Sequence, residues 1–252
     1  MIPAQRENYI IEKLSETGTI KVEDLASELG VSLMTIRRDL DRLQDKGVLY
    51  RSHGGAVLRS VYPIEQSYDV KKISNIDAKN KIASAALELI NEGDTIFLDA
   101  GTTTLELAKL LKTKKNLTVI TDDLKIALEL YKSNVETYIV GGRVQKDTAC
   151  IIGPTAEDFI KNIKVNLCFL GTSSITSDGY LSTPTFEKAY LKREVVRASS
   201  YSVLMVDSSK FKRESFVNIL SIKEINCIIT NKQFDEGEIR SLEEENIRII
   251  NA

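Results

Sequence analysis

The stretch VSLMTIRRDL, from Val31 to Leu40, decides the fold of the first part of this chain. Apolar residues recur in it and just beyond it at steps of three, four and three: Leu33, Ile36, Leu40 and Leu43. An α-helix has about 3.6 residues per turn, so these side chains form one stripe, and the spacing predicts a helix that packs this stripe on a small core. Ser32 precedes the stripe and is predicted to cap the helix with its hydroxyl group.

The opposite face of the predicted helix carries side chains suited to reading DNA. These are Met34, Thr35, Arg37, Arg38 and Arg42, with Ser32 at the helix start. Arginine bonds guanine edges or phosphates, threonine bonds either, and an exposed methionine contacts a thymine methyl group. We therefore expect this face to bind double-stranded DNA; the alternative is a helical module that binds protein.

A second short amphipathic helix is predicted just upstream, from Val22, Leu25, Ala26 and Leu29. Gly30 lies in the tight turn between the two helices, which is the spacing of a helix-turn-helix whose second helix enters the major groove. The formal charge changes from −3 over residues 1–30 to +3 over residues 31–60, although the whole chain carries −2. A locally basic face supplies phosphate contacts without making the whole surface basic.

A hairpin is predicted after this helix, with residues 48–53 and 56–59 paired across Gly54-Gly55, a dipeptide that readily adopts positive φ angles. This hairpin would be the wing of a winged helix, with Arg51 and His53 near the DNA backbone or minor groove. His53 is the single histidine of the chain, and we interpret it as a surface residue rather than a catalyst or a metal ligand.

These residues resemble a family of bacterial transcriptional regulators, the DeoR type. The resemblance rests on VSLMTIRRDL, on the helix end from Leu43 to Gly47 and on RSHGGA at 51–56, and it continues through the rest of the chain. It implies a regulator that binds operator DNA, most often as a repressor of a carbohydrate operon.

Length and composition allow one small and one larger domain, since the chain has 252 residues of which 42% are hydrophobic. We expect a winged helix-turn-helix over residues 1–59, a linker over 60–74 around Pro63, and an effector-sensing domain over 75–252. No apolar run approaches a membrane span and no signal-peptide pattern is present, so we expect a cytoplasmic protein without a membrane partner. Cys150, Cys168 and Cys227 are expected to be buried core residues, with no metal and no cofactor bound.

The remainder of the chain alternates helical and strand patterns, which predicts an α/β domain with a mainly parallel sheet. Predicted strands cover 94–99, 117–121, 135–140, 165–170, 202–206 and 226–230. Predicted helices cover 82–90, 105–111, 124–131, 186–198 and 234–245. In such a sheet the ligand-binding residues gather at the carboxyl ends of the strands.

The stretch from Asp99 to Thr104, DAGTTT, follows a predicted strand and opens a predicted helix. Backbone amides, the helix dipole and the hydroxyl groups of Thr102, Thr103 and Thr104 meet there beside Gly101, an arrangement that suits a phosphate group. The alternative is simple helix capping. The stretch matches neither a lysine-containing P-loop nor a dinucleotide fingerprint, so nucleotide hydrolysis is not expected.

Other predicted strand ends add candidate ligand contacts: Gly141 and Gly142, Gly171, and Lys210. Lys210 could hold a phosphate or sugar oxygen, or it could be an exposed lysine in a turn. The DeoR-type resemblance adds Glu187 and implies an effector domain with a ribose-phosphate-isomerase-like fold and a pocket for a phosphorylated sugar. The chain departs from that family at Thr121-Asp122-Asp123, where Thr-Asn is more typical, so an extra carboxylate stands at this strand end.

A sugar-phosphate isomerase fused to a winged helix is the enzymatic alternative. Aldose-ketose chemistry needs a carboxylate base within hydrogen-bond reach, and the loop of residues 171–175 that follows the strand 165–170 contains no acid. Glu187 and Glu194 remain as possible bases, but we expect structural or effector-contacting roles for them and no enzymatic turnover. The non-enzymatic alternative is an architectural DNA-binding protein whose second domain serves only for oligomerisation. A single winged helix covers few base pairs, so we expect a homo-oligomer.

Overall fold

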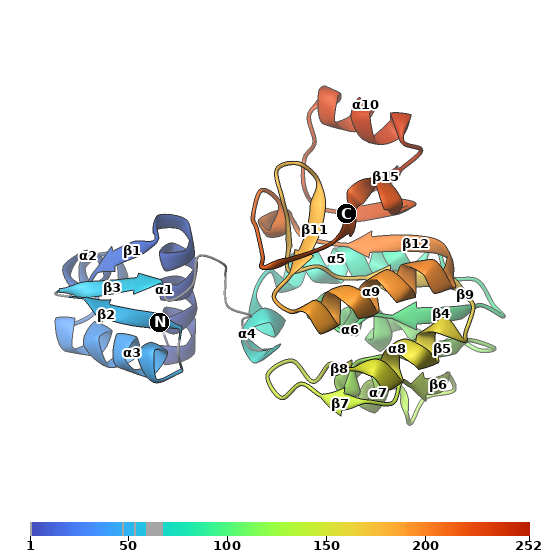
Figure 1. Ribbon diagram of the computed structural model, residues 1–252, viewed down its shortest axis with the longest axis horizontal. Helices are drawn as coiled ribbons and strands as arrows, with labels where there is room; N and C mark the ends of the chain where they lie inside the picture. The colour runs from blue at the N-terminus through green and yellow to red at the C-terminus, as the bar shows by residue number, and fades with distance from the viewer. Residues whose placement is uncertain (1, 47, 53, 59–67) are drawn as a thin grey trace. The chain divides into compact units, whose positions relative to one another are not determined.

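The computed structural model describes residues 2–46, 48–52, 54–58 and 68–252, and the chain divides into two compact units, Met1–Glu65 and Gln66–Ala252 (Figure 1). The first unit contains α1 (Pro3–Thr17), β1 (Thr19–Lys21), α2 (Val22–Leu29), α3 (Leu33–Asp45), β2 (Leu49–Ser52) and β3 (Gly55–Leu58). The predicted helix-turn-helix corresponds to α2 and α3, while α1 and β1 were not predicted. The strands form an antiparallel sheet in the order β1-β3-β2.

The core of the first unit collects side chains from all three helices and from the sheet. Ile36, Leu40 and Leu43 of α3 are buried as predicted. The prediction for Leu33 was wrong, because its side chain is 43% exposed. Leu33 is the first residue of α3 and projects beyond the edge of the small core, and Val31 packs against the core instead.

The hairpin forms, but its turn lies one residue earlier than predicted. Ser52 pairs with Gly55, so Gly55 lies in the strand rather than in the turn, and Gly54 supplies the positive φ of 81°. Gly55 belongs to β3 and passes close to β1, where an added Cβ would lie 2.0 Å from the carbonyl oxygen of Ile20. Gly55 is therefore required by a close approach of two strands rather than by the turn. His53 and Arg59 lie outside the described residues.

The second unit contains twelve described strands, seven described α-helices and two described 3-10 helices. Its helices are α4 (Tyr68–Ile73), α5 (Ile76–Leu87), α6 (Thr102–Leu111), α7 (Leu124–Leu130), α8 (Pro154–Lys161), α9 (Phe186–Ala198), η1 (Ser208–Lys210), η2 (Ile222–Glu224) and α10 (Glu236–Glu244). Its strands are β4 (Thr95–Leu98), β5 (Thr118–Thr121), β6 (Glu136–Ile139), β7 (Arg143–Val144), β8 (Ile151–Ile152), β9 (Val165–Leu170), β10 (Ser174–Ile175), β11 (Tyr180–Thr183), β12 (Ser199–Met205), β13 (Val217–Ser221), β14 (Cys227–Thr230) and β15 (Arg248–Asn251).

Seven of these strands form a parallel sheet in the order β15-β14-β12-β9-β4-β5-β6. This confirms the predicted α/β class with a mainly parallel sheet. A three-stranded sheet, β10-β11-β13, and the β7–β8 pair were not predicted. From β4 the chain runs through β5 to β6 on one side, and it then returns to β9 on the other side of β4, so the carboxyl ends of strands far apart in sequence meet at one edge.

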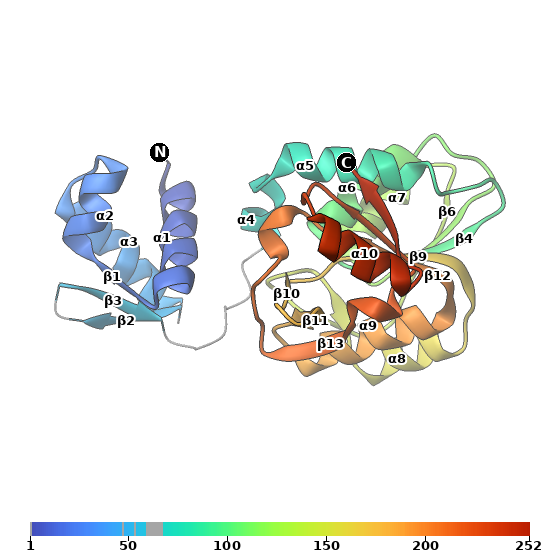
Figure 2. The same ribbon diagram turned by 90° about the horizontal axis from the view of Figure 1, so that it is seen from above.

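Helices cover both faces of the parallel sheet (Figure 2). Alternate residues of one strand enter different cores: Ile96 and Leu98 of β4 pack with α5, α6 and α7, whereas Phe97 packs with α8 and α9. This alternation follows from the two-residue period of a strand. The three cysteines are buried, as predicted, and each is a free thiol.

The predicted linker, 60–74, overlaps α4. Tyr68 of α4 is 5% exposed and packs in the core beneath α5 and α6, so residues from Tyr68 onward are part of the second unit. Residues 59–67 lie outside the described part of the chain.

Candidate functional site

The face of α3 that points away from the core presents Met34, Arg37 and Arg38 to solvent. The Met34 side chain is 57% exposed and both arginines are exposed. Among the described residues, no ion pair engages either arginine. Both guanidinium groups are therefore available to phosphates or base edges.

Ser32 caps α3 as predicted. Its Oγ accepts a hydrogen bond from the backbone amide of Thr35 at 3.2 Å, and the two hydroxyl groups lie 2.9 Å apart. Ser32 and Thr35 thus fix the start of the helix and stand beside Met34 at the end that a major groove would meet first.

Arg42 and Arg51 have partners within the first unit. The Nη1 atom of Arg42 lies 3.4 Å from Asp39 and 3.8 Å from Glu7, and the Nε atom of Arg51 lies 3.4 Å from Asp41. These pairs hold the ends of α3 to α1 and to β2. A contact of either arginine with DNA would add to an existing ion pair, or replace it.

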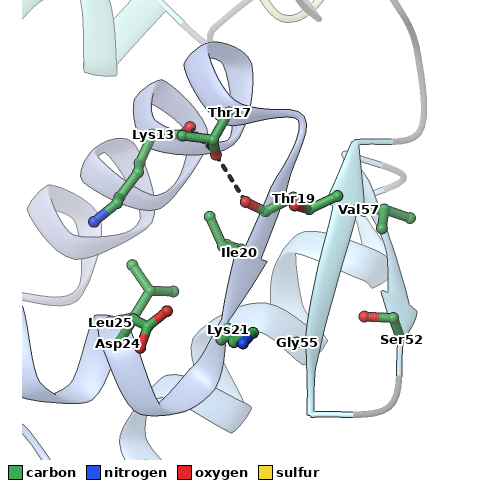
Figure 3. Close-up of a pocket in the computed structure, with 10 residues that line it drawn as sticks. All are labelled: Lys13, Thr17, Thr19, Ile20, Lys21, Asp24, Leu25, Ser52, Gly55 and Val57. Atoms are coloured by element: carbon green, nitrogen blue, oxygen red, sulfur yellow. Dashed lines mark hydrogen bonds between the residues drawn. The ribbon is translucent and has the colours of Figure 1, made fainter.

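A shallow hollow lies on another part of the first unit, against the sheet (Figure 3). Its lining comes from α1, β1, α2, β2 and β3: Lys13, Thr17, Thr19, Ile20, Lys21, Asp24, Leu25, Ser52, Gly55 and Val57. The Thr17 hydroxyl donates to the carbonyl of Thr19 at 2.7 Å and closes one side. None of the lining residues belongs to α3, so this hollow is separate from the basic face.

In the second unit, the start of α6 lies at the carboxyl end of β4. Gly101 is the N-cap residue, and the amides of the first helical turn have no acceptor within the helix. Thr104 is buried and its hydroxyl donates to the carbonyls of Asp99 at 2.7 Å and Gly101 at 2.9 Å, which is a structural role. Thr103 is half-buried. Of the three threonine hydroxyl groups in this turn, that of Thr103 is best placed to contact a ligand.

Asp99 faces β9 and α9 rather than open space. Its carboxylate is 1% exposed, accepts a hydrogen bond from the amide of Gly171 at 2.8 Å and pairs with the ammonium group of Lys192. Lys192 also donates to the carbonyl of Gly171 at 3.0 Å. The structure thus brings together two predicted site residues, Asp99 and Gly171, but as a closed ion-pair cluster.

Lys79 of α5 is a buried lysine beside the start of α6. Its ammonium group donates to the carbonyls of Lys71 and of Ser74, the latter at 2.6 Å, and the Thr102 hydroxyl lies 3.5 Å from the same Lys71 carbonyl. Burial lowers the pKa of Lys79 to about 8, an effect that Asp207 opposes and Lys210 reinforces. A second anion placed here would stabilise the charged form of Lys79.

Lys210 lies in η1, close enough to Lys79 for the two charges to repel each other. Asn75 ties this segment to the start of α5, since its side-chain amide donates to Asp207 Oδ1 at 3.0 Å and to Ser209 Oγ at 3.3 Å. Asn75 adopts a left-handed conformation with φ of 51°. Lys79 thus lies between two neighbours: it shares the Lys71 carbonyl with Thr102, the first residue of α6, and its charge is repelled by that of Lys210 in η1.

Gly141, Gly142 and Glu187 belong to another part of this edge. Gly142 has φ of 151°, and a Cβ added to it would lie 2.7 Å from the carbonyl oxygen of Ile152 in the β7–β8 pair. Glu187 forms an ion pair with Arg143 at 3.4 Å. Among the described residues, no hydrogen bond or ion pair joins these three residues to the start of α6.

The two aspartates after β5 are buried. Asp123 caps α7 by accepting hydrogen bonds from the amides of Lys125 at 2.7 Å and Ile126 at 3.3 Å, and its second oxygen accepts from the amide of Gly101 at 3.2 Å. Burial raises the pKa of Asp123 to about 6 although these amides lower it. The carboxylate of Asp123 thus already occupies one amide of the predicted phosphate site.

The sequence interpretation missed Lys79, assigned no role to Lys192, and noted Asp123 at its strand end without predicting its contact with Gly101. Lys79 stands on the same stripe of α5 as the buried Ile82, Ala83 and Ala86, and Lys192 stands on the apolar stripe of α9. A charged residue at a core position of an amphipathic helix was the available signal, because burial of a lysine requires partners.

Two family models match the chain: the DeoR C terminal sensor domain over residues 74–232 and the DeoR-like helix-turn-helix domain over residues 6–61. The chain belongs to the DeoR family of transcriptional regulators. This DeoR-family regulator is 36% identical over 252 residues to the HTH-type transcriptional regulator GlpR of Haloferax volcanii, covering 100% of this chain and 99% of the relative. It is 34% identical over 232 residues to the glycerol-3-phosphate regulon repressor of Escherichia coli K12, covering 92% of each.

Solved structures that resemble the DeoR-family regulator do so in part. Ribose 5-phosphate isomerase A from Methanocaldococcus jannaschii shares 17% identity over 55% of each chain, with a TM-score of 0.41. The eIF2B delta subunit from Chaetomium thermophilum shares 19% identity over 66% of this chain and 60% of its own, with a TM-score of 0.49. A likeness of this degree does not establish a shared activity.

No helix among the described residues is long and apolar enough to cross a membrane. In the same part of the chain, no group of three or more His, Cys, Asp or Glu side chains is arranged to hold a metal ion.

Proposed function

We propose that this protein is a repressor of a carbohydrate-utilisation operon and that a phosphorylated sugar or polyol controls its binding to operator DNA. The observation that carries the proposal is the presence of two sites on one chain: the face of α3 with Arg37 and Arg38, which form no ion pair within the described residues, and the start of α6 with the buried Lys79 beside it. The names of the relatives, which include a glycerol-3-phosphate regulon repressor, support the same class of effector.

Operator DNA is read by the exposed face of α3 in this proposal. Arg37 and Arg38 contact phosphates and guanine edges, and Met34 contacts a thymine methyl group. Ser32, Thr35, Arg42 and Arg51 add contacts around them, and His53 completes the wing. Two or more copies bind repeated half-sites, because one α3 reads too few base pairs for genomic specificity.

The effector phosphate binds at the start of α6. The free amides of Thr102 and Thr103, the Thr103 hydroxyl and the ammonium groups of Lys79 and Lys210 supply donors and positive charge there. Asp99, Gly101, Thr104 and Gly171 shape the surrounding loops. Gly141, Gly142 and Glu187 are the candidates for contacts with the sugar end of a longer ligand.

We further propose that the protein works in the cytoplasm and is not an enzyme. Lys192 holds Asp99 in an ion pair, and the loop of residues 171–175 after β9 contains no acid, so neither position supplies a free base for proton transfer between adjacent carbons. Incubation with ribose 5-phosphate tests this point, because protein-dependent interconversion at enzymatic rates would contradict it.

A thermal-shift screen of the full chain tests the effector class. Sugar phosphates and polyol phosphates are compared with their unphosphorylated counterparts, and each ligand that raises the midpoint is then tested for release of an operator fragment selected from random DNA. A ligand that binds the folded state raises the midpoint by mass action. We expect phosphorylated compounds alone to act in both assays. Stabilisation by a free sugar or a nucleotide alone would refute the phosphate site.

A further inference from the structure

Three carboxyl groups are buried together where β4 and β5 end. Asp99 and Asp122 are each 1% exposed and Asp123 is fully buried. A buried carboxylate is costly unless strong donors or a positive charge stabilise it. The donors available to each of the three groups therefore decide which of them carry a negative charge.

Two of the three groups have strong donors. Asp99 pairs with the Lys192 ammonium and accepts from the Gly171 amide at 2.8 Å. Asp123 accepts hydrogen bonds from three backbone amides, those of Gly101, Lys125 and Ile126.

Asp122 has almost no strong hydrogen-bond donors near it. One oxygen accepts a hydrogen bond from the Cys150 thiol at 3.3 Å, and a thiol is a weak donor. The other oxygen, Oδ1, is buried and has no hydrogen-bond partner. Ionisation of this carboxyl group is therefore unfavourable at neutral pH, whereas a neutral carboxylic acid resembles an asparagine amide in shape and charge.

The groups that face Asp122 also disfavour a negative charge on it. Asp99 from the end of β4 and Asp123 from the start of α7 add negative charge beside it, and the Cys150 thiol before β8 is neutral. On α9, Lys192 is committed to Asp99, and Lys188 donates to the Thr148 hydroxyl at 3.3 Å. Burial and the neighbouring Asp99 raise the pKa of Asp122 to about 8, in spite of the opposing effect of Lys192.

We infer that Asp122 is a specificity-determining residue that stays a neutral carboxylic acid and thereby lets this end of the sheet accept an anionic ligand. The adjacent Asp123 already contacts Gly101 at the start of α6, so a second negative charge one residue away would repel a phosphate there. The inference rests on the proposed phosphate site. The proton on the Asp122 carboxyl group, however, is a property of the ligand-free protein.

The first test measures that proton directly. Side-chain carboxyl resonances of the full chain, labelled with 13C at aspartate, are followed from pH 5 to pH 10, and the Asp122 signal is identified by its loss in Asp122→Asn. We expect this carboxyl to titrate near pH 8. If no aspartate carboxyl of the wild-type protein titrates above pH 7, the inference is overturned, and this reading needs no variant.

The second test uses sulfate, whose charge is constant over this range, as a probe for the anion site. The midpoint of thermal unfolding is measured with and without sulfate at pH 6 and pH 9 for the wild type, Asp122→Asn and the exposed control Asp158→Asn. Lys79 also loses charge near pH 8, so the proteins are compared at each pH. We expect equal sulfate effects at pH 6, and at pH 9 a smaller effect in the wild type and Asp158→Asn than in Asp122→Asn.

The outcomes separate the two proposals. Equal sulfate effects in all three proteins at pH 9 would overturn the role of Asp122 and leave the anion site standing. No sulfate effect in any protein at either pH would overturn the anion site, and with it the role of Asp122 in specificity, while the titration still reports the proton.

Discussion

Arg6 of α1 and Asp39 of α3 form a buried ion pair with two hydrogen bonds, Nε to Oδ2 at 2.6 Å and Nη2 to Oδ1 at 3.1 Å. Asp39 lies on the buried side of α3, opposite the exposed arginines, and its side chain is 1% exposed. The pair therefore fixes the rotation of α3 about its axis relative to α1, and so determines which residues of α3 face outward.

Replacing Asp39 with asparagine should destabilise the first unit by about 3 kcal/mol, because it leaves the Arg6 charge buried without its carboxylate. Urea unfolding followed by circular dichroism measures this loss. Asp45→Asn changes an exposed acid at the end of the same helix and should have little effect. Equal stabilities of the two variants would show that the pair contributes nothing.

Replacing Arg38 with alanine should weaken operator binding by about 1–3 kcal/mol, or roughly five- to 150-fold, and leave the unfolding midpoint unchanged. Fluorescence anisotropy at fixed salt gives the affinity, and Arg240→Ala, an exposed arginine on α10, is the matched control. Unchanged affinity in Arg38→Ala would mean that α3 presents another face to DNA.

Replacing Gly55 with alanine should distort the sheet of the first unit, since the new Cβ would meet the Ile20 carbonyl at 2.0 Å unless a strand moves. We expect a lower unfolding midpoint and weaker operator binding. The comparison is Gly30→Ala, where φ is 62° but no atom lies within 4 Å of an added Cβ. A milder effect at Gly55 than at Gly30 would argue that the strands separate easily.

Replacing Thr103 with aspartate should abolish stabilisation by phosphorylated ligands, because it places a negative charge where the phosphate is proposed to bind. Operator binding without ligand should persist, so the variant should repress without responding. Thr113→Asp, at an exposed position beyond α6, controls for the added charge. A normal thermal shift in Thr103→Asp would place the ligand elsewhere.

Replacing Lys79 with methionine should change the pH dependence of stability. The pKa of Lys79 is lowered from 10.5 to about 8 by burial, so between these values the unfolded chain binds a proton that the folded chain does not. Stability of the wild type should therefore rise with pH through this window relative to Lys79→Met, by up to about 3 kcal/mol. Urea unfolding at pH 7.5 and pH 10 measures the difference, and parallel changes in both proteins would contradict it.

Local patterns predicted much of the fold. The limits of β9 and α9 match the predicted 165–170 and 186–198, because each segment has a clear period and clear ends. The register of the hairpin was wrong by one residue. Gly54 and Gly55 look alike in sequence, and only the third strand, β1, shows why Gly55 has to be a glycine.

The candidate site was predictable only in part. The start of α6 follows from one short stretch, but Asp123 and Lys192 become site residues through partners more than 20 positions away, Gly101 and Asp99. Lys79 is held by nearer groups, the carbonyls of Lys71 and Ser74. Asp39 is a case similar to Asp123 and Lys192, since the sequence alone suggests an exposed acid and only the fold brings Arg6 beside it. Long-range pairing of charged groups leaves no periodic signal in a single sequence.

The apolar cores of the two units share no residue. The core of the first unit is built from residues between Tyr9 and Ala56, and those of the second from residues between Tyr68 and Ala252. The DNA-binding function and the effector-sensing function thus belong to separately packed units. Recombination within the segment between them would yield hybrid regulators that keep one operator and respond to a different metabolite, without repacking either interior.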